Sequence, residues 1–356
     1  MQVFLIAIAL LFSPLAHAQR ITLASHTPVM VTSQASRSTL FVDCYKHHNQ
    51  DSLTYFNGTA DVIVPIPGCE LSVALQTSGP GMLNANDVFD LVYTANGPCL
   101  PTNGSGAGWS GDTSGSITKR GTGYSAIDET VRGYPTNGAA ITHCYQGAID
   151  LGPIAVNQGA LVGSVCTDPT APGKVSYVRG SGATGGGAAR LCVWSVDDED
   201  MKTEVTDNGP NWTFLGFTSG GTIVDVENLD QSVNGGAGNQ VVFLSGLARH
   251  SPAVSAVISM GSSVAFMPAY CGIGFSLDHG GATSPDRLAE HLSPVSTVGV
   301  AADGVSWELF GTGVHSYEPM VGMHSIQEQE TTDGLARCWF RTVGGQREGL
   351  TFIFPM

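Results

Sequence analysis

The chain has 356 residues and a net charge of −15, with 15 Lys and Arg against 30 Asp and Glu. This acidity argues against binding to nucleic acid or to an anionic membrane, because both need a basic surface. Hydrophobic residues make up 42% of the chain, which excludes wholesale disorder. The 46 glycines follow no Gly-X-Y period, so collagen is also excluded, and many short strands joined by tight turns are favoured.

The first 18 residues have the pattern of a secretory signal peptide. An unbroken apolar run from Val3 to Phe12 is followed by the breaker Ser13-Pro14 and by the small residues of Ala16-His17-Ala18. This order predicts export and cleavage after Ala18. The apolar run is too short to cross a bilayer, and we expect no membrane span in the mature chain. The alternative is a retained hydrophobic arm that inserts into a neighbouring subunit.

A small N-terminal β region is predicted over residues 19–78. In the strand expected at 38–45, Leu40, Val42 and Cys44 alternate and so lie on one face. Strands at 51–56 and 61–66 flank Asn57-Gly58, a pair that favours a hairpin turn because both residues tolerate a positive φ.

Two larger units are predicted over residues 79–202 and 203–356. Many short strands, regular turns and little helix indicate an all-β fold of tandem antiparallel β-sandwich, jelly-roll-like domains. A helical turn is expected only at 285–292. The acidic run at 197–200 is interpreted as a solvated turn between the units, because its contiguous spacing differs from that of a calcium loop. The expected strands are 87–93, 160–166, 174–179, 190–194, 212–218, 240–244, 251–260, 265–277, 295–300, 305–310 and 350–354.

The chain has eight cysteines. An even number without CxxC or Cys/His metal spacing, behind a signal-like start, favours disulfides formed in an oxidising compartment. We predict local pairs, Cys44 with Cys69 and Cys271 with Cys338, although the spacing leaves other connectivities open. The alternative is that the thiols are free and buried, where cysteine behaves as a small hydrophobe.

No motif assigns a catalytic residue, a metal or a cofactor. The 10 histidines fall in no HExxH frame, and no GxSxG motif occurs. A long Gly-, Ser- and Thr-rich loop is expected at 103–123, and loops of this length are usually functional or mobile. Trp109, Tyr124 and Tyr134 lie in loop-like sequence and are predicted to bind a ligand, since aromatic faces beside polar groups suit sugar rings. The alternative is that these aromatics fold inward and close one end of a sandwich.

A series of segments, taken in order, extends over almost all of the chain after the signal-like start. They are RITL and TPV (20–29), STLFV and YK (38–46), LTYFNG (53–58), ELSVAL (70–75), DVFD (87–90), LVGSV (161–165), AARLCVWS (188–195), NQVVFLSGLA (239–248) and GIGFSLD (272–278). In this order they resemble a family of bacteriophage virion proteins of the tail-fibre or appendage type. The chain differs from that pattern in its signal-like start, its many cysteines and its acidic run after Trp194.

The resemblance implies a non-enzymatic structural protein. We expect a homo-oligomer in the virion or outside the cell that contacts other virion or surface proteins and binds a cell-surface glycan or neighbouring subunits. One alternative is a secreted bacterial lectin-like adhesin without a virion role. Another is a glycan hydrolase on a β scaffold, whose paired carboxylates sequence spacing would not reveal.

Overall fold

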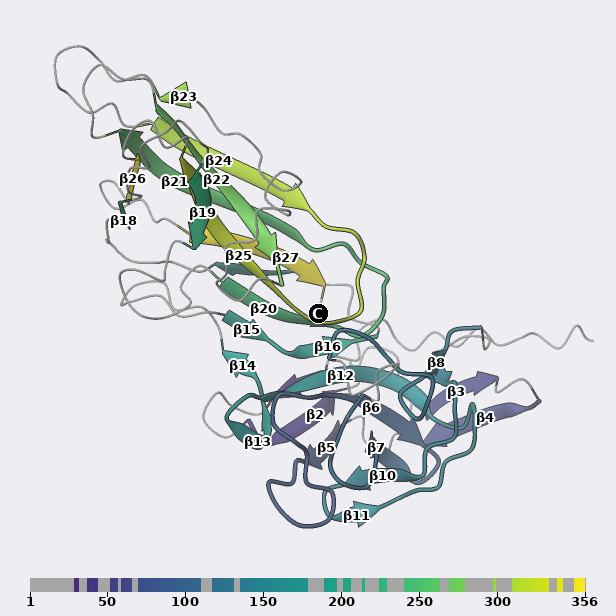
Figure 1. Cartoon of the computed structure of the whole chain (residues 1–356). Coiled ribbons are helices and arrows are strands. Elements are labelled where there is room, and N and C mark those ends of the chain that lie inside the picture. The colour runs from purple at the N-terminus through teal and green to yellow at the C-terminus, as the bar shows by residue number, and fades with distance from the viewer. Residues whose placement is uncertain are drawn as a thin grey trace, which may run out of the picture.

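The computed structural model of the chain is all-β in the residues that it describes, which confirms the predicted fold class (Figure 1). Its sheets are antiparallel except for one parallel pair of strands. Among the described residues, no helix is long and apolar enough to cross a membrane. The structure describes residues 29–31, 37–43, 52–56, 59–65, 70–109, 117–130, 135–178, 189–196, 201–205, 213–214, 224–228, 240–262, 269–278, 297–298, 309–332, 338–341 and 349–355.

The N-terminal lobe, as we name it, contains two small sheets and one large sheet. β1, β2 and β5 form a three-stranded sheet, and β3 pairs with β4 on the two sides of the predicted Asn57-Gly58 turn, which itself lies outside the described residues. Both strands predicted beside that turn are confirmed. The strands are β1 (Val29–Val31), β2 (Thr39–Asp43), β3 (Ser52–Phe56), β4 (Asp61–Pro65) and β5 (Glu70–Ala74).

The large sheet has the order β11-β10-β7-β6-β12-β9-β8, and β13 and β16 also pair with β12. Every residue of β6 and of β12 is buried, as expected for strands covered on both faces. The strands are β6 (Val88–Thr94), β7 (Gly97–Thr102), β8 (Ile127–Asp128), β9 (Thr136–Asn137), β10 (His143–Gln146), β11 (Ile149–Asp150), β12 (Ala160–Asp168), β13 (Ala171–Val175) and β16 (Val193–Ser195).

The C-terminal lobe is an elongated sandwich of two sheets (Figure 1). One sheet has the order β14-β15-β20-β25-β22-β23, with β19 on β25, and the other has the order β17-β27-β21-β26-β18, with β24 on β21. The ring centre of Phe243 on β20 lies 4.8 Å from that of Phe352 and 5.2 Å from that of Phe354, both on β27. The two sheets therefore pack face to face through interdigitated side chains.

The strands of the C-terminal lobe are β14 (Tyr177–Val178), β15 (Ala189–Leu191), β17 (Met201–Val205), β18 (Thr213–Phe214), β19 (Val224–Asn228), β20 (Gln240–Ser245), β21 (Ala253–Ser262), β22 (Ala269–Leu277), β23 (Thr297–Val298), β24 (Leu309–Ser316), β25 (Gly322–Thr332), β26 (Cys338–Arg341) and β27 (Gly349–Pro355).

The chain crosses between the lobes more than once. β14 and β15 belong to a C-terminal sheet, but β16 returns to pair with β12 before β17 leaves again. The stretch 190–194, expected as one strand, is thus divided at Cys192. One hydrophobic core runs through both lobes, from Leu40 to Phe354. The predicted boundary after residue 202 stays a prediction.

The expected helical turn at 285–292 and the acidic run at 197–200 also lie outside the described residues. The strand expected at 305–310 overlaps β24 only at Leu309 and Phe310, since β24 runs from Leu309 to Ser316, and residues 305–308 lie outside the described residues.

Candidate functional site

Trp109 is not an exposed ring. Its side chain is 1% exposed, because the loop that carries it turns inward against β6. Asp87 Oδ2 accepts a hydrogen bond from the Gly108 amide at 2.9 Å, and the Val88 carbonyl accepts one from the Trp109 amide at 2.7 Å. The Arg120 guanidinium lies 4.2 Å from the centre of the indole, a cation–π contact. The ring of Trp109 therefore folds inward in this structure, and ligand binding by Trp109 stays a prediction.

Tyr124 is half-buried in the same loop. Its hydroxyl donates to the Gly108 carbonyl, and its ring packs against the buried cluster of Cys99, Ile141, Cys144 and Ile154. Burial, together with the nearby negative charge of Asp87, raises the pKa of Tyr124 to about 12. The hydroxyl thus holds the loop in place. Tyr134 lies outside the described residues, so ligand binding by Tyr124 and Tyr134 stays a prediction.

A buried polar network joins the two lobes at this loop. Arg120 pairs with Asp90 of β6, which is 3% exposed. The guanidinium also donates to the Gly246 carbonyl, from Nε at 3.0 Å and from Nη2 at 2.9 Å. The Ser164 hydroxyl of β12 donates to Asp90 Oδ1 at 2.8 Å. A side chain at Gly246 would collide with Trp194, so only glycine allows this close approach.

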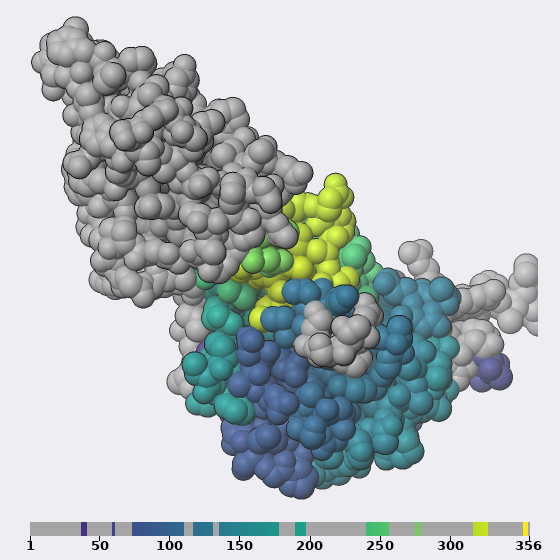
Figure 2. All heavy atoms as spheres, viewed as in Figure 1, coloured from purple at the N-terminus to yellow at the C-terminus, as the bar shows by residue number. Residues whose placement is uncertain are grey.

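Further contacts between the lobes are made by residues 117–130. The Met323 amide donates to the Ile117 carbonyl at 2.8 Å, next to Gly322, whose φ is +121°. An exposed ion pair joins Arg249 Nη2 to Glu129 Oε2 at 2.9 Å. Figure 2 shows the yellow-green surface around residue 320 lying directly against the blue N-terminal lobe. The described part of the long loop therefore connects the lobes.

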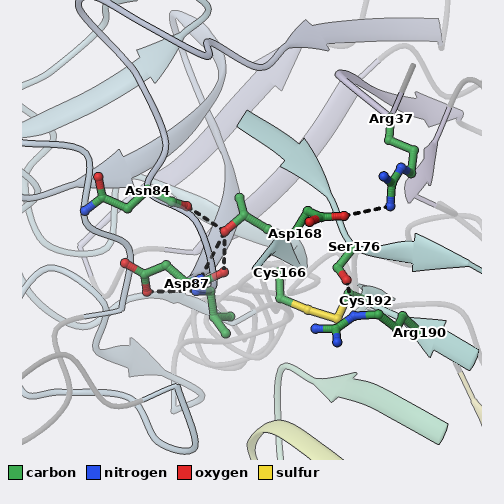
Figure 3. The surroundings of a disulfide bond; sticks show 10 residues. Arg37, Asn84, Asp87, Cys166, Asp168, Ser176, Arg190 and Cys192 are labelled. Carbon is green, nitrogen blue, oxygen red and sulfur yellow. Dashed lines mark hydrogen bonds and ion pairs between the residues drawn. A yellow bond between two sulfur atoms is a disulfide. The ribbon is translucent and has the colours of Figure 1, made fainter. Parts of the chain in front are cut away.

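A second polar junction lies beside a disulfide where β2, β12 and β15 approach one another (Figure 3). Arg37 Nη1 lies 3.0 Å from Asp168 Oδ2, and Arg190 Nε donates to the Ser176 hydroxyl. Burial acts to raise the pKa of Asp168, but hydrogen bonds from Thr170 and the charge of Arg37 outweigh it and hold the pKa below its ordinary value. Burial lowers the pKa of Arg190. These groups link the small N-terminal sheet to the seam between the lobes.

This junction gives a pH-dependent prediction. Arg37→Gln should lower the free energy of unfolding by about 2 kcal/mol at neutral pH, the typical contribution of a hydrogen bond to a charged group. Because the folded pKa of Asp168 is depressed, its stabilisation is present above the ordinary pKa of 3.8 and is lost as the pH falls through the lowered value. Urea unfolding of both proteins across this range should show the two stabilities converging in acid. A difference that stays constant into strong acid would contradict the assignment.

Within the described residues two disulfides are formed, Cys99–Cys144 and Cys166–Cys192, with Cα–Cα distances of 5.3 Å and 5.1 Å. The sequence proposed neither pair. The predicted bond between Cys271 and Cys338 stays a prediction. The backbone of Cys271 lies on β22 and that of Cys338 on β26, in opposite sheets of the C-terminal sandwich. Cys44 and Cys69 lie outside the described residues.

The part of the chain that the structure describes contains two histidine–carboxylate pairs, neither of which was selected from the sequence. In the C-terminal lobe, His324 is 9% exposed and has both ring nitrogens bonded, Nδ1 to Asp278 Oδ2 at 2.8 Å and Nε2 to the Val321 carbonyl at 3.0 Å. This pair joins β25 to the end of β22 and has no ring nitrogen left for a ligand. No group of three or more metal-ligating side chains is gathered within the described residues.

The other pair lies at the surface, on the edge of the large sheet. His143 Nδ1 is 2.7 Å from Asp150 Oδ2, and the two side chains are 39% and 34% exposed. The His143 ring is nearly parallel to that of Tyr145, with an interplanar angle of 10°. We call His143, Tyr145 and Asp150 the ring surface. In the sequence, the only pattern that could have indicated this surface is the alternation of His143 and Tyr145 around Cys144. Three residues are too few to predict a binding surface.

The chain matches no protein-family model and no curated protein sequence. Among solved structures, a chain of infectious bursal disease virus Gt strain is similar over 92% of this chain and 74% of its own, with 11% identity and a TM-score of 0.28. The CBM22-1 xylan-binding domain of Paenibacillus barcinonensis Xyn10C is similar over 43% of this chain and 94% of its own, with 15% identity and a TM-score of 0.20. The C-terminal CBM6 of LamC from Zobellia galactanivorans is similar over 43% of this chain and 100% of its own, with 11% identity and a TM-score of 0.17. These scores are too low to bear on function.

Proposed function

We propose that the chain is a non-enzymatic structural and adhesive protein of the virion-appendage kind, which binds a surface glycan or neighbouring subunits. The observation that carries the proposal is the buried junction of Asp90, Arg120 and Ser164. These residue types serve catalysis elsewhere, but here they bond to one another and to the Gly246 carbonyl across the two lobes. A polar network that is satisfied internally fixes a unique arrangement of the core. Such rigidity suits a protein that presents a binding surface.

The disulfides support a place outside the cytoplasm. Cys99–Cys144 joins β7 to β10 of the large sheet, and Cys166–Cys192 joins β12 to the residue between β15 and β16. Disulfides persist in oxidising compartments and on virion or cell surfaces. We propose that the protein works as a homo-oligomer in the virion or at the outer surface, in contact with other virion or surface proteins. The appendage part of the proposal rests on the resemblance of the sequence segments.

Fractionation of a producing culture tests this function. An antibody to the chain is applied to particles purified on a density gradient and to the particle-free supernatant. The proposal expects the chain in the particle fraction, in a fixed ratio to the major particle protein. Its presence only in the supernatant or on cells would overturn the virion role and favour the secreted lectin-like adhesin, which the signal-like start and the disulfides also suit. Release of reducing sugar from host polysaccharide by the pure protein would overturn the non-enzymatic role.

A further inference from the structure

We propose that the ring surface of His143, Tyr145 and Asp150 binds the face of a neutral sugar in a cell-surface polysaccharide. The inference rests on the proposed adhesive function and gives it a site. It also moves that site away from Trp109, whose ring is buried, to the β10–β11 hairpin on the edge of the large sheet.

The register of the hairpin places the three side chains together. His143 and Tyr145 are alternate residues of β10 and project from one face, and Tyr145 lies directly opposite Asp150 of β11. The ring centres of His143 and Tyr145 are 6.2 Å apart. Two nearly parallel rings along one strand offer an apolar strip on which the C–H face of a sugar can stack.

The backbone around the rings is held before any ligand arrives. Gly104 and Gly81 adopt left-handed φ values of +84° and +76°. A Cβ at Gly104 would lie 2.8 Å from His143 Cδ2 and 3.0 Å from its Nε2. One at Gly81 would lie 2.2 Å from the Gly147 carbonyl oxygen and 3.0 Å from Tyr145 Cδ1, so the two glycines let the loops pack against the hairpin and the edges of its rings. Cys144, between the rings, is bonded to Cys99. A surface held in this way loses little conformational entropy on binding.

The polar atoms of the ring surface suit sugar hydroxyls. Asp150 Oδ1 accepts from the amides of Cys144 at 3.0 Å and Gly152 at 2.9 Å, which orients the carboxylate toward His143. In the neutral imidazole, Nδ1 then donates to Asp150 and Nε2 keeps its lone pair. No described residue is hydrogen-bonded to that Nε2. The carboxylate and Nε2 can both accept from hydroxyl groups.

Charge selects neutral sugars over acidic ones. Partial burial acts to raise the pKa of Asp150, but the hydrogen bonds from His143 and the two amides outweigh it and keep the pKa below its ordinary value. The carboxylate is therefore charged at neutral pH. The whole chain also carries a net charge of −15. An anionic polysaccharide would meet repulsion both at the site and at long range.

Affinity electrophoresis of the full chain tests the proposal. Native gels contain mannan, dextran or galactan as neutral probes, and polygalacturonate as the anionic comparator. We expect at least one neutral polysaccharide to retard the protein and polygalacturonate not to do so. Tyr145→Ala and His143→Ala should each weaken the interaction by roughly tenfold, as expected for the loss of one stacking ring.

Ile149→Ser is the matched control. Ile149 is 62% exposed in the same hairpin but pairs with Gln146, so it projects from the opposite face. The control should be retarded like the unmodified chain. If Tyr145→Ala does not fold, Tyr145→Leu replaces it in the test, because leucine fills the space without supplying a ring.

Three results would overturn the site: retardation by no neutral polysaccharide, equal retardation of the ring variants and the unmodified chain, or loss of binding in Ile149→Ser as well. The chain could still be found in the particle fraction after any of these results, so failure of the ring surface is distinguishable from failure of the structural role.

Discussion

Arg120→Met should lower the free energy of unfolding by about 3 to 5 kcal/mol, the typical cost of removing one partner of a buried ion pair. Asp90 would remain in β6 at 3% exposure, with the Ser164 hydroxyl as its one side-chain donor among the described residues, and the Gly246 carbonyl would lose both of its guanidinium bonds. Urea unfolding followed by tryptophan fluorescence, with the disulfides intact, measures the change. Protease sensitivity between the lobes should rise in parallel.

Two further variants separate charge burial from general damage. Arg249→Gln removes another pair between the lobes, but that pair is 37% and 48% exposed and should cost less than about 1 kcal/mol. The double variant Asp90→Leu with Arg120→Met removes both buried charges and should recover much of the loss. If Arg120→Met is no more costly than Arg249→Gln, the buried junction does not hold the lobes together.

Replacing Cys99 and Cys144 together by alanine should lower the stability by about 4 kcal/mol. The bond closes a loop with a sequence separation of 45, and chain-entropy reasoning assigns a loop of this length about that loss. The replacement also frees the backbone between His143 and Tyr145, so polysaccharide binding should weaken with stability. Thermal unfolding of the variant and of the unmodified chain measures the first effect, and affinity electrophoresis measures the second.

The reductant provides the control for this variant. Dithiothreitol should destabilise the unmodified chain more than the alanine variant, because the variant retains only Cys166–Cys192 of the two described bonds. Equal unfolding temperatures of the unmodified chain with and without reductant would show that neither bond contributes to stability.

The strands that sequence reasoning located are those whose side chains are buried. β6, β12 and β20 are rich in Val, Leu and Phe, so their composition and their burial agree. β25 was missed, although at 11 residues it pairs with β20 on one side and β22 on the other. Its sequence, GMHSIQEQETT, has no alternation of apolar and polar residues. It is a strand because it pairs with β20 and β22, which are distant in the sequence.

β7 was missed for a different reason. Pro98 and Pro101 have no amide hydrogen to donate, which argues against a strand with neighbours on both sides. β7 nevertheless lies between β6 and β10. Disulfide bonding between Cys99 of this strand and Cys144 of β10 supplies a cross-link that local propensity does not contain.

The candidate site shows the same limit. Sequence reasoning selected aromatics in loop-like segments because loops usually lie at the surface. Trp109 instead turns inward, since Asp87 and Arg120 come from other parts of the chain to hold it. The ring surface depends on the register between β10 and β11, which sets Asp150 opposite Tyr145. Neither arrangement can be derived from spacing along the chain.

We propose that the chain is an exported β protein cross-linked by disulfides, and one measurement tests this proposal most directly. Protein purified from its native producer is digested without reduction, and its cross-linked peptides and intact mass are determined. We expect a chain that begins at Gln19, with Cys99 joined to Cys144 and Cys166 joined to Cys192. A full-length chain with eight alkylatable thiols would contradict export and disulfide bonding, and would indicate a protein assembled in a reducing compartment whose first 18 residues serve as an arm.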